Sequence, residues 1–153
     1  MKQRKNKWLR LSTLIIIGTV LNVVAILFLG NIFDLFVDQP KQEYLDELSS
    51  EELLIMGVIF APLLESLLII LVIYIFQTFT KNTITTIIVT GILFGLGHYA
   101  PGESWTTPIV LAVSGMIYTV FYLKAKNQQV SGYVTIAVMH GISNLLMILP
   151  NMS

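Results

Sequence analysis

Long apolar stretches separated by short polar segments dominate the pattern of this chain. Five uncharged or nearly uncharged stretches cover residues 11–33, 53–79, 83–99, 106–123 and 130–150. A helix rises ~1.5 Å per residue and a bilayer core is ~30 Å thick, so each stretch is long enough, or nearly so, to cross a membrane. We therefore predict an all-α protein, a polytopic bundle of about five transmembrane helices.

The composition agrees with a membrane protein and leaves no room for a second domain. Hydrophobic residues make up 55% of the 153 positions and charged residues 12%, and the mean hydropathy is +0.78. A soluble domain carries roughly 25% charged residues. We expect residues 1–153 to form one domain surrounded by the lipid bilayer, with no nucleic-acid partner. The chain has no cysteine, which excludes a disulfide framework, a thiolate metal site and a cysteine nucleophile.

Charges sort by sign onto the two sides that five spans define. The bases on one side are Lys2, Arg4, Lys5, Lys7, Arg10, Lys81, Lys124 and Lys126. The opposite side carries Lys41 and the acids Asp34, Asp38, Glu43, Asp46, Glu47, Glu51, Glu52 and Glu103. Because positive loops stay cytoplasmic, we expect the N-terminus inside and the C-terminus outside the cell membrane. The acidic segment 34–52 is expected to be a surface loop with an interfacial helical turn.

Three ionisable residues interrupt the apolar stretches. Glu65 is the only acid or base inside one, and the two histidines, His98 and His140, lie inside two others. A charge at the bilayer centre costs at least ~3 kcal/mol on insertion scales, so such groups mark a partner, a cavity or a function. Counted at ~1.5 Å per residue, Glu65 and His140 lie near mid-membrane and His98 lies closer to the outer end of its span. We predict that the three groups share one site.

Local spacing adds further polar groups to this site. His140 and Asn144 are four residues apart and therefore lie on one helix face. Pro62 precedes Glu65 by three residues, where it frees backbone carbonyls and can bend the helix. Small residues that let a neighbouring helix approach closely are Gly91, Gly95 and Gly97. The pattern predicts a polar pocket between packed helices.

These residue types leave several interpretations open. A glutamate and histidines can activate a water and stabilise an oxyanion for peptide hydrolysis. Glu65, His98 and His140 could instead hold zinc, because two histidines and a glutamate are a known ligand set, although the H-E-x-x-H arrangement is absent. They could also be packing groups that join helices, worth ~0.6–2 kcal/mol each. In a small proton-coupled transporter, Glu65 would carry the proton.

Three short motifs resemble those of a known family. Glu65 within APLLES, Phe94-x-x-x-His98 within FGLGH and His140-x-x-x-Asn144 within HGISN resemble the motifs of the CPBP intramembrane proteases in order and spacing. That family includes the CAAX prenyl endopeptidases and the bacteriocin-processing or bacteriocin-immunity proteins known as Abi proteins. The resemblance covers residues 53–149. It implies a glutamate intramembrane protease fold in a bacterial cell membrane, with a peptide or membrane-protein substrate.

The resemblance also implies a role for each motif residue. Glu65 and His98 would activate a water, and His140 and Asn144 would stabilise the oxyanion. No cofactor or obligatory metal is implied. Peptide or bacteriocin processing, or immunity, is the expected context.

The first motif departs from the family pattern, which is E-E-x-x-x-R. Ser66 stands at the second glutamate and Ile70 at the arginine, so the buried ion pair that would orient this motif is missing. Two outcomes are consistent with this loss. The chain is either a protease with altered activity or a non-catalytic membrane binding or immunity protein of the same fold.

Overall fold

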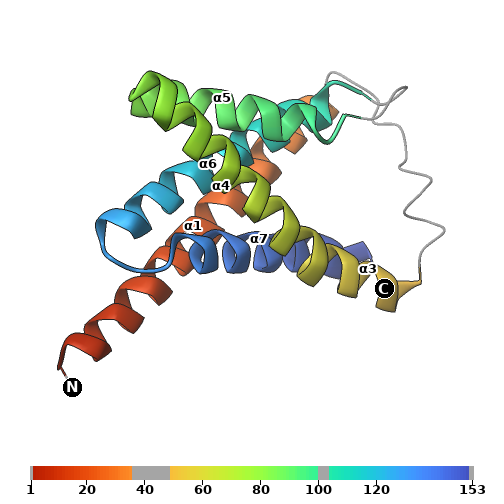
Figure 1. Ribbon diagram of the computed structural model, residues 1–153. Coiled ribbons are helices and arrows are strands. Elements are labelled where there is room, and N and C mark those ends of the chain that lie inside the picture. The colour runs from red at the N-terminus through yellow and green to blue at the C-terminus, as the bar shows by residue number, and fades with distance from the viewer. Residues whose placement is uncertain (1, 36–48, 100–103, 152–153) are drawn as a thin grey trace.

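The computed structural model describes residues 2–35, 49–99 and 104–151, and every regular element in these ranges is helical (Figure 1). In chain order the elements are α1 (Lys2–Asp34), α3 (Ser50–Leu54), the π-helix η1 (Ile55–Phe60), α4 (Ala61–Thr80), α5 (Thr83–Leu96), α6 (Thr106–Asn127), α7 (Gly132–Ile148) and the short 3-10 helix η2 (Leu149–Asn151). The fold class predicted from the sequence, an all-α helical bundle, is confirmed.

Within the described ranges, three helices are long and apolar enough to cross a membrane. They are Asn6–Asp34, the continuous helix Ser50–Thr80 formed by α3, η1 and α4, and Thr106–Asn127. α5 has 14 residues and α7 has 17, which correspond to ~21 Å and ~26 Å and fall short of a ~30 Å core. The chain is therefore a membrane protein, and full crossing by 83–99 and 130–150 stays a prediction.

Local side-chain caps explain where the shorter helices begin. The Asn82 side chain accepts hydrogen bonds from the backbone N–H groups of Ile84 and Thr85 at the start of α5. Ser131 caps α7 in the same way. Ser49 and Glu52 form a capping box that starts α3. In the predicted acidic loop 34–52, Asp34 ends α1, this capping box starts α3, and residues 36–48 lie outside the described ranges.

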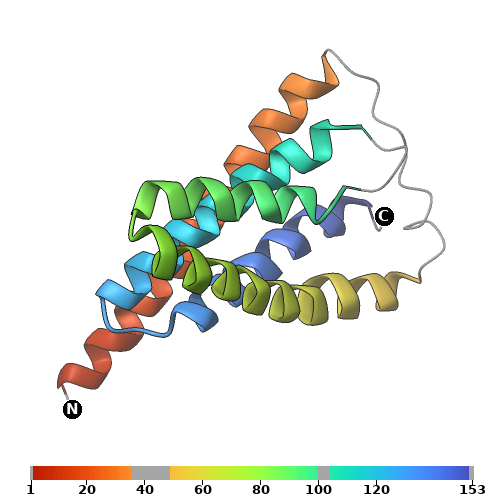
Figure 2. The same ribbon diagram turned by 45° about the horizontal axis from the view of Figure 1, so that its top comes forward.

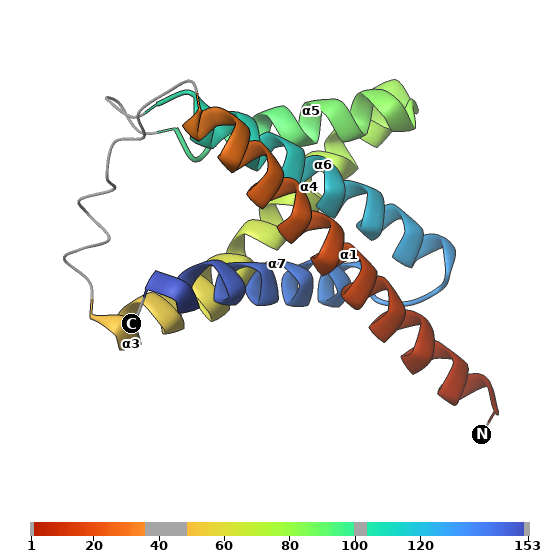
Figure 3. The same cartoon turned by 180° about the vertical axis from the view of Figure 1, so that it is seen from behind.

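α6 is the central helix of the bundle. It packs against α1, α5 and α7, and its most extensive contact is with α5. Figure 2 shows α5 crossing α6, and Figure 3 shows α1 running diagonally along α6 on the opposite side. α4 packs against both α5 and α7. The helices that carry the three sequence motifs, α4, α5 and α7, are thereby gathered around one central helix.

Two glycines, which have no side chain, let α5 lie close to α6. A Cβ at Gly95 would overlap the Pro108 carbonyl oxygen, and a Cβ at Gly91 would overlap Met116. The close approach predicted at these two glycines is confirmed. Gly97 differs, because the nearest atoms to a Cβ there are Leu93 O and Phe94 O of its own helix, at 3.3 and 3.5 Å.

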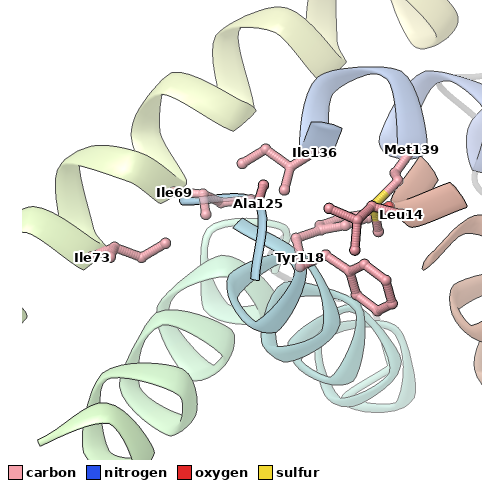
Figure 4. Packing of buried hydrophobic residues seen from close by; sticks show 8 residues of the cluster. Leu14, Ile69, Ile73, Tyr118, Ala125, Ile136 and Met139 are labelled. Carbon is pink, nitrogen blue, oxygen red and sulfur yellow. The ribbon is translucent and has the colours of Figure 1, made fainter. Parts of the chain in front are cut away.

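The apolar core lies where α1, α4, α6 and α7 meet. Figure 4 shows its side chains converging on α6. The buried members are Leu14, Ile69, Ile73, Tyr118, Phe121, Ala125, Ile136 and Met139. Since Met139 directly precedes His140, this core fixes the part of α7 that carries the histidine. The core therefore fixes the position of α4, which carries Glu65, relative to α7, which carries His140.

Candidate active site

Glu65 and His98 form the centre of the site. Glu65 lies on α4, and His98 follows the end of α5, where a tight turn joins its N–H to Gly95 O at 3.0 Å. His98 Nε2 lies 3.2 Å from Glu65 Oε2. Both side chains are partly exposed, at 30% for His98 and 25% for Glu65. The pair is therefore close enough to act together and open enough for a small molecule to reach.

The other ring nitrogen of His98 is already engaged. Nδ1 lies 2.8 Å from the carbonyl oxygen of Phe94, one turn earlier on the same helix. Because a carbonyl oxygen only accepts, Nδ1 carries the hydrogen of this bond. When the ring is neutral, Nε2 then presents a lone pair. Glu65 Oε2 is buried and has no aligned hydrogen-bond partner among the described atoms, although Nε2 is near. His98 Nε2 and Glu65 Oε2 therefore lie close together, and each of them can accept a proton.

His140 approaches the same carboxylate from the buried side. Its Nε2 lies 3.6 Å from Glu65 Oε2, and its side chain is only 6% exposed. Its ring stacks on Tyr118, with centroids 4.9 Å apart, and meets the ring of Phe94 edge-on at 5.8 Å. The structure thus brings together Glu65, His98 and His140 from three helices. Their catalytic roles stay a prediction.

Asn144 is directed elsewhere. Its amide Nδ2 donates to Gly57 O at 2.7 Å, in the π-helix η1. In η1 the N–H of Ala61 bonds to Met56 O, so the spacing is five residues. By that spacing Gly57 O should accept from residue 62, but Pro62 has no N–H. Asn144 therefore satisfies a carbonyl that the proline leaves without a helical partner.

A cavity of about 430 Å³ lies beside Glu65 and His98, between α4 and α5. Thr90 is the one other residue in its lining with a polar side chain, and the remaining walls are Leu68, Ile69, Val72, Leu93, Phe94 and Gly97. Asn144 instead lines a separate cavity of about 390 Å³ that includes residues of α1, α6 and α7. The expectation of one cavity lined by all four predicted residues is wrong for His140 and Asn144. His140 reaches Glu65 from the buried side without lining this cavity, and the π-helix engages the amide of Asn144.

Two residues that the sequence motifs do not include support His140. Tyr118 of α6 is 2% exposed, and Asn22 of α1 is fully buried and donates from Nδ2 to the Tyr118 hydroxyl at 2.9 Å. Asn22 is an amide inside an apolar stretch, but it lacks the four-residue spacing from a histidine that selected Asn144, so the sequence did not connect it with the site. Tyr118 has no sequence signal either, because tyrosines are common in membrane spans.

The altered first motif is also visible in the structure. Ser66 is fully buried, and its Oγ has no hydrogen-bond partner within the described ranges. Ile70, one turn later, packs against the apolar core. At these two positions the chain therefore places a small side chain and an apolar side chain inside the bundle.

The sequence also allowed a zinc site at Glu65, His98 and His140. In the part of the chain that the structure describes, no three His, Asp or Glu side chains are arranged to hold a metal ion.

Taken together, the fold and the site define a helical membrane protein with a glutamate and two histidines gathered below its surface. The family model of type II CAAX prenyl endopeptidase Rce1-like proteins matches residues 50–146. The chain belongs to this family. No curated protein and no solved structure matches it. The matched region includes all three motifs and excludes α1.

Proposed function

We propose that this protein is an intramembrane endopeptidase in which Glu65 and His98 activate a water to hydrolyse a peptide bond. The observation that carries the proposal is the 3.2 Å approach of His98 Nε2 to Glu65 Oε2 beside a largely apolar cavity. A general base must reach its proton directly or through one water. A water in this cavity would meet that condition for both groups. Membership of a prenyl endopeptidase family supports the same reaction.

In the proposed reaction, the water loses a proton to Glu65 while its oxygen attacks the carbonyl carbon. His98 orients the water and the carboxylate. The proton then moves from the Glu65 carboxyl to the leaving nitrogen as the C–N bond breaks, which yields a carboxylic acid and an amine. His140, on the buried side of the same carboxylate oxygen, is proposed to donate a hydrogen bond to the oxyanion. Asn144 can join it only after its bond to Gly57 O breaks.

The substrate class follows from the cavity and the family. Its leucine, isoleucine and valine walls suit an apolar peptide segment or a lipid-modified one. We propose a peptide or membrane-protein substrate that reaches the site from the bilayer, with a prenylated C-terminal peptide as the first candidate. Processing of bacteriocins or other peptides at a bacterial cell membrane is the proposed context.

The test compares Glu65→Gln with wild type in lipid vesicles. Two fluorogenic probes are used, a farnesylated CAAX peptide and the same peptide without the lipid. Glu65→Gln keeps size and hydrogen bonding but removes the base, so cleavage should fall by at least ~100-fold while the melting temperature stays unchanged. Glu51→Gln, an exposed acid in the first turn of α3, is the matched control and should cleave like wild type. Full activity of Glu65→Gln would rule out this mechanism, and inhibition by a chelator would point to zinc.

A second candidate function is a non-catalytic binding or immunity protein of the same fold. The burial of Ser66 and the apolar packing of Ile70 favour it, because the ion pair of the first family motif is gone. The double variant Ser66→Glu, Ile70→Arg separates the two functions. If the loss only weakened an enzyme, the double variant should cleave faster than wild type. If the protein is a binder, cleavage should stay absent, and Ser66→Glu alone should cost roughly 3–5 kcal/mol for an unpaired buried charge.

A further inference from the structure

A second cavity, of about 460 Å³, lies between the first half of α1 and the end of α6, apart from the catalytic residues. One part of its lining is apolar, with Leu14, Ile17 and Phe121. The other part is polar and basic, with Arg10, Lys124 and Asn127. None of the described residues that line it is acidic. The cavity is therefore a trough with an apolar half and a positively charged half.

The two bases in the trough are not neutralised by the protein. Within the described ranges neither Arg10 nor Lys124 forms an ion pair, and both are exposed. The Lys124 ammonium lies 5.3 Å above the ring of Phe121, and Lys126 lies 5.8 Å above Tyr122. Long basic side chains that lie along apolar groups in this way are typical of the membrane interface.

The position of the trough along the helices matches the depth of a lipid headgroup. The apolar stretch of α1 begins directly after Arg10, and the apolar part of α6 ends directly before Lys124. The charged half of the trough therefore lies where the hydrocarbon core ends, and the apolar half lies within it. Basic pockets between helices at this depth suit anionic headgroups.

We propose that this trough binds one anionic phospholipid. Its phosphate lies between Arg10 and Lys124, with Asn127 as a further hydrogen-bond donor, and an acyl chain lies along Leu14, Ile17 and Phe121. The two unpaired cations favour an anion, and the apolar half favours a ligand with a hydrocarbon chain. A bilayer lipid supplies both. This site is independent of the proposed peptidase activity.

The experiment measures lipid retained by the purified full-length protein. Wild type, the double variant Arg10→Gln, Lys124→Gln and the control Lys81→Gln are taken from mixed phosphatidylglycerol and phosphatidylcholine vesicles and studied by native mass spectrometry. Lys81 is a base outside the trough, at the end of α4. Wild type and Lys81→Gln should retain phosphatidylglycerol preferentially. The double variant should bind it about 30-fold more weakly, since each base near a membrane surface is worth about a factor of five. Equal retention by the double variant would overturn the proposal.

A second variant tests for a shaped site as opposed to general attraction of anions. Thr13→Trp fills the trough from α1 and keeps both cations, and Thr13→Leu is a milder version for use if the tryptophan variant does not fold. Either variant should lose the preference for phosphatidylglycerol while its melting temperature in pure phosphatidylcholine matches wild type. Retained preference would mean surface attraction only and would overturn the site. Displacement of the lipid by soluble glycerol phosphate would show that the acyl chain does not contribute to binding and would overturn the proposal of a lipid ligand.

Discussion

Asn144 can be assigned two roles, and the two roles predict different effects of removing its side chain. The family resemblance makes its amide an oxyanion donor, whereas the structure uses the amide to satisfy Gly57 O. A buried carbonyl without a partner costs free energy whether or not the protein is an enzyme. Stability and catalysis can therefore be measured separately at this position.

We predict that Asn144→Ala mainly lowers stability. It leaves Gly57 O unpaired, so the free energy of unfolding should fall by about 1–3 kcal/mol. Loss of an oxyanion donor would instead lower kcat by ~100–1,000-fold. Melting temperature and cleavage rate are measured on the same vesicle samples. Leu146→Ala, on an exposed part of α7, is the control and should change neither quantity greatly. An unchanged melting temperature with a hundredfold slower reaction would show that Asn144 acts on the oxyanion.

At the scale of elements, the hydrogen bond from Asn144 to Gly57 O joins α7 to the π-helix η1. If the missing N–H of Pro62 frees Gly57 O for Asn144, Pro62→Ala should restore a helical partner for that oxygen. Asn144→Ala should then cost less in the Pro62→Ala background, with a coupling energy of about 1 kcal/mol or more. Pro108→Ala, which changes a proline in the first turn of α6, is the control and should give additive effects. Additivity at Pro62 would mean that the proline is not the cause of the bond.

The contact between α5 and α6 gives a second prediction at this scale. Gly95→Ala should push the two helices apart, because its Cβ would meet the Pro108 carbonyl oxygen and Ala112. Overpacking of this kind typically costs ~1–3 kcal/mol. Gly97→Ala should leave the melting temperature near wild type, since Gly97 has an ordinary helical φ of −63° and no atom of α6 lies within 4 Å of an added Cβ. Thermal melts of both variants provide the comparison, and equal melting temperatures would show that the contact can relax.

At the scale of the whole molecule, the sorting of bases and acids predicts a topology. Because this chain has no cysteine, single cysteines can be introduced at Ser49 and Asn127, which are both exposed. An impermeant maleimide added to intact cells should label Ser49→Cys and not Asn127→Cys, since positive loops remain inside. Labelling of both after lysis is the control. The reverse pattern would invert the proposed orientation of the chain.

The helices and most of the candidate site can be predicted from the sequence, because placing a charged group in lipid costs so much free energy. The apolar stretches locate the helices, and the cost of an ionisable group in lipid selects Glu65, His98 and His140. The π-helix could not be predicted, because an apolar pattern records which side chains face lipid and not which N–H bonds to which carbonyl. For the same reason the partner of Asn144, a backbone atom of a distant helix, has no sequence signal. The support of His140 by Asn22 through Tyr118 depends on tertiary packing alone.

The position of α1 has a consequence for comparative genomics. The family model begins at residue 50, so the first helix lies outside the shared region, yet Asn22 binds Tyr118 and Gly18 makes room for Met139. Homologues should therefore vary less at the buried positions of this helix, such as Leu14, Gly18 and Asn22, than on its exposed faces. A larger residue at position 18 should be accompanied by a smaller residue at position 139, and a smaller residue at position 18 by a larger one at position 139. Position 22 should lose its amide in lineages where position 118 loses its hydroxyl.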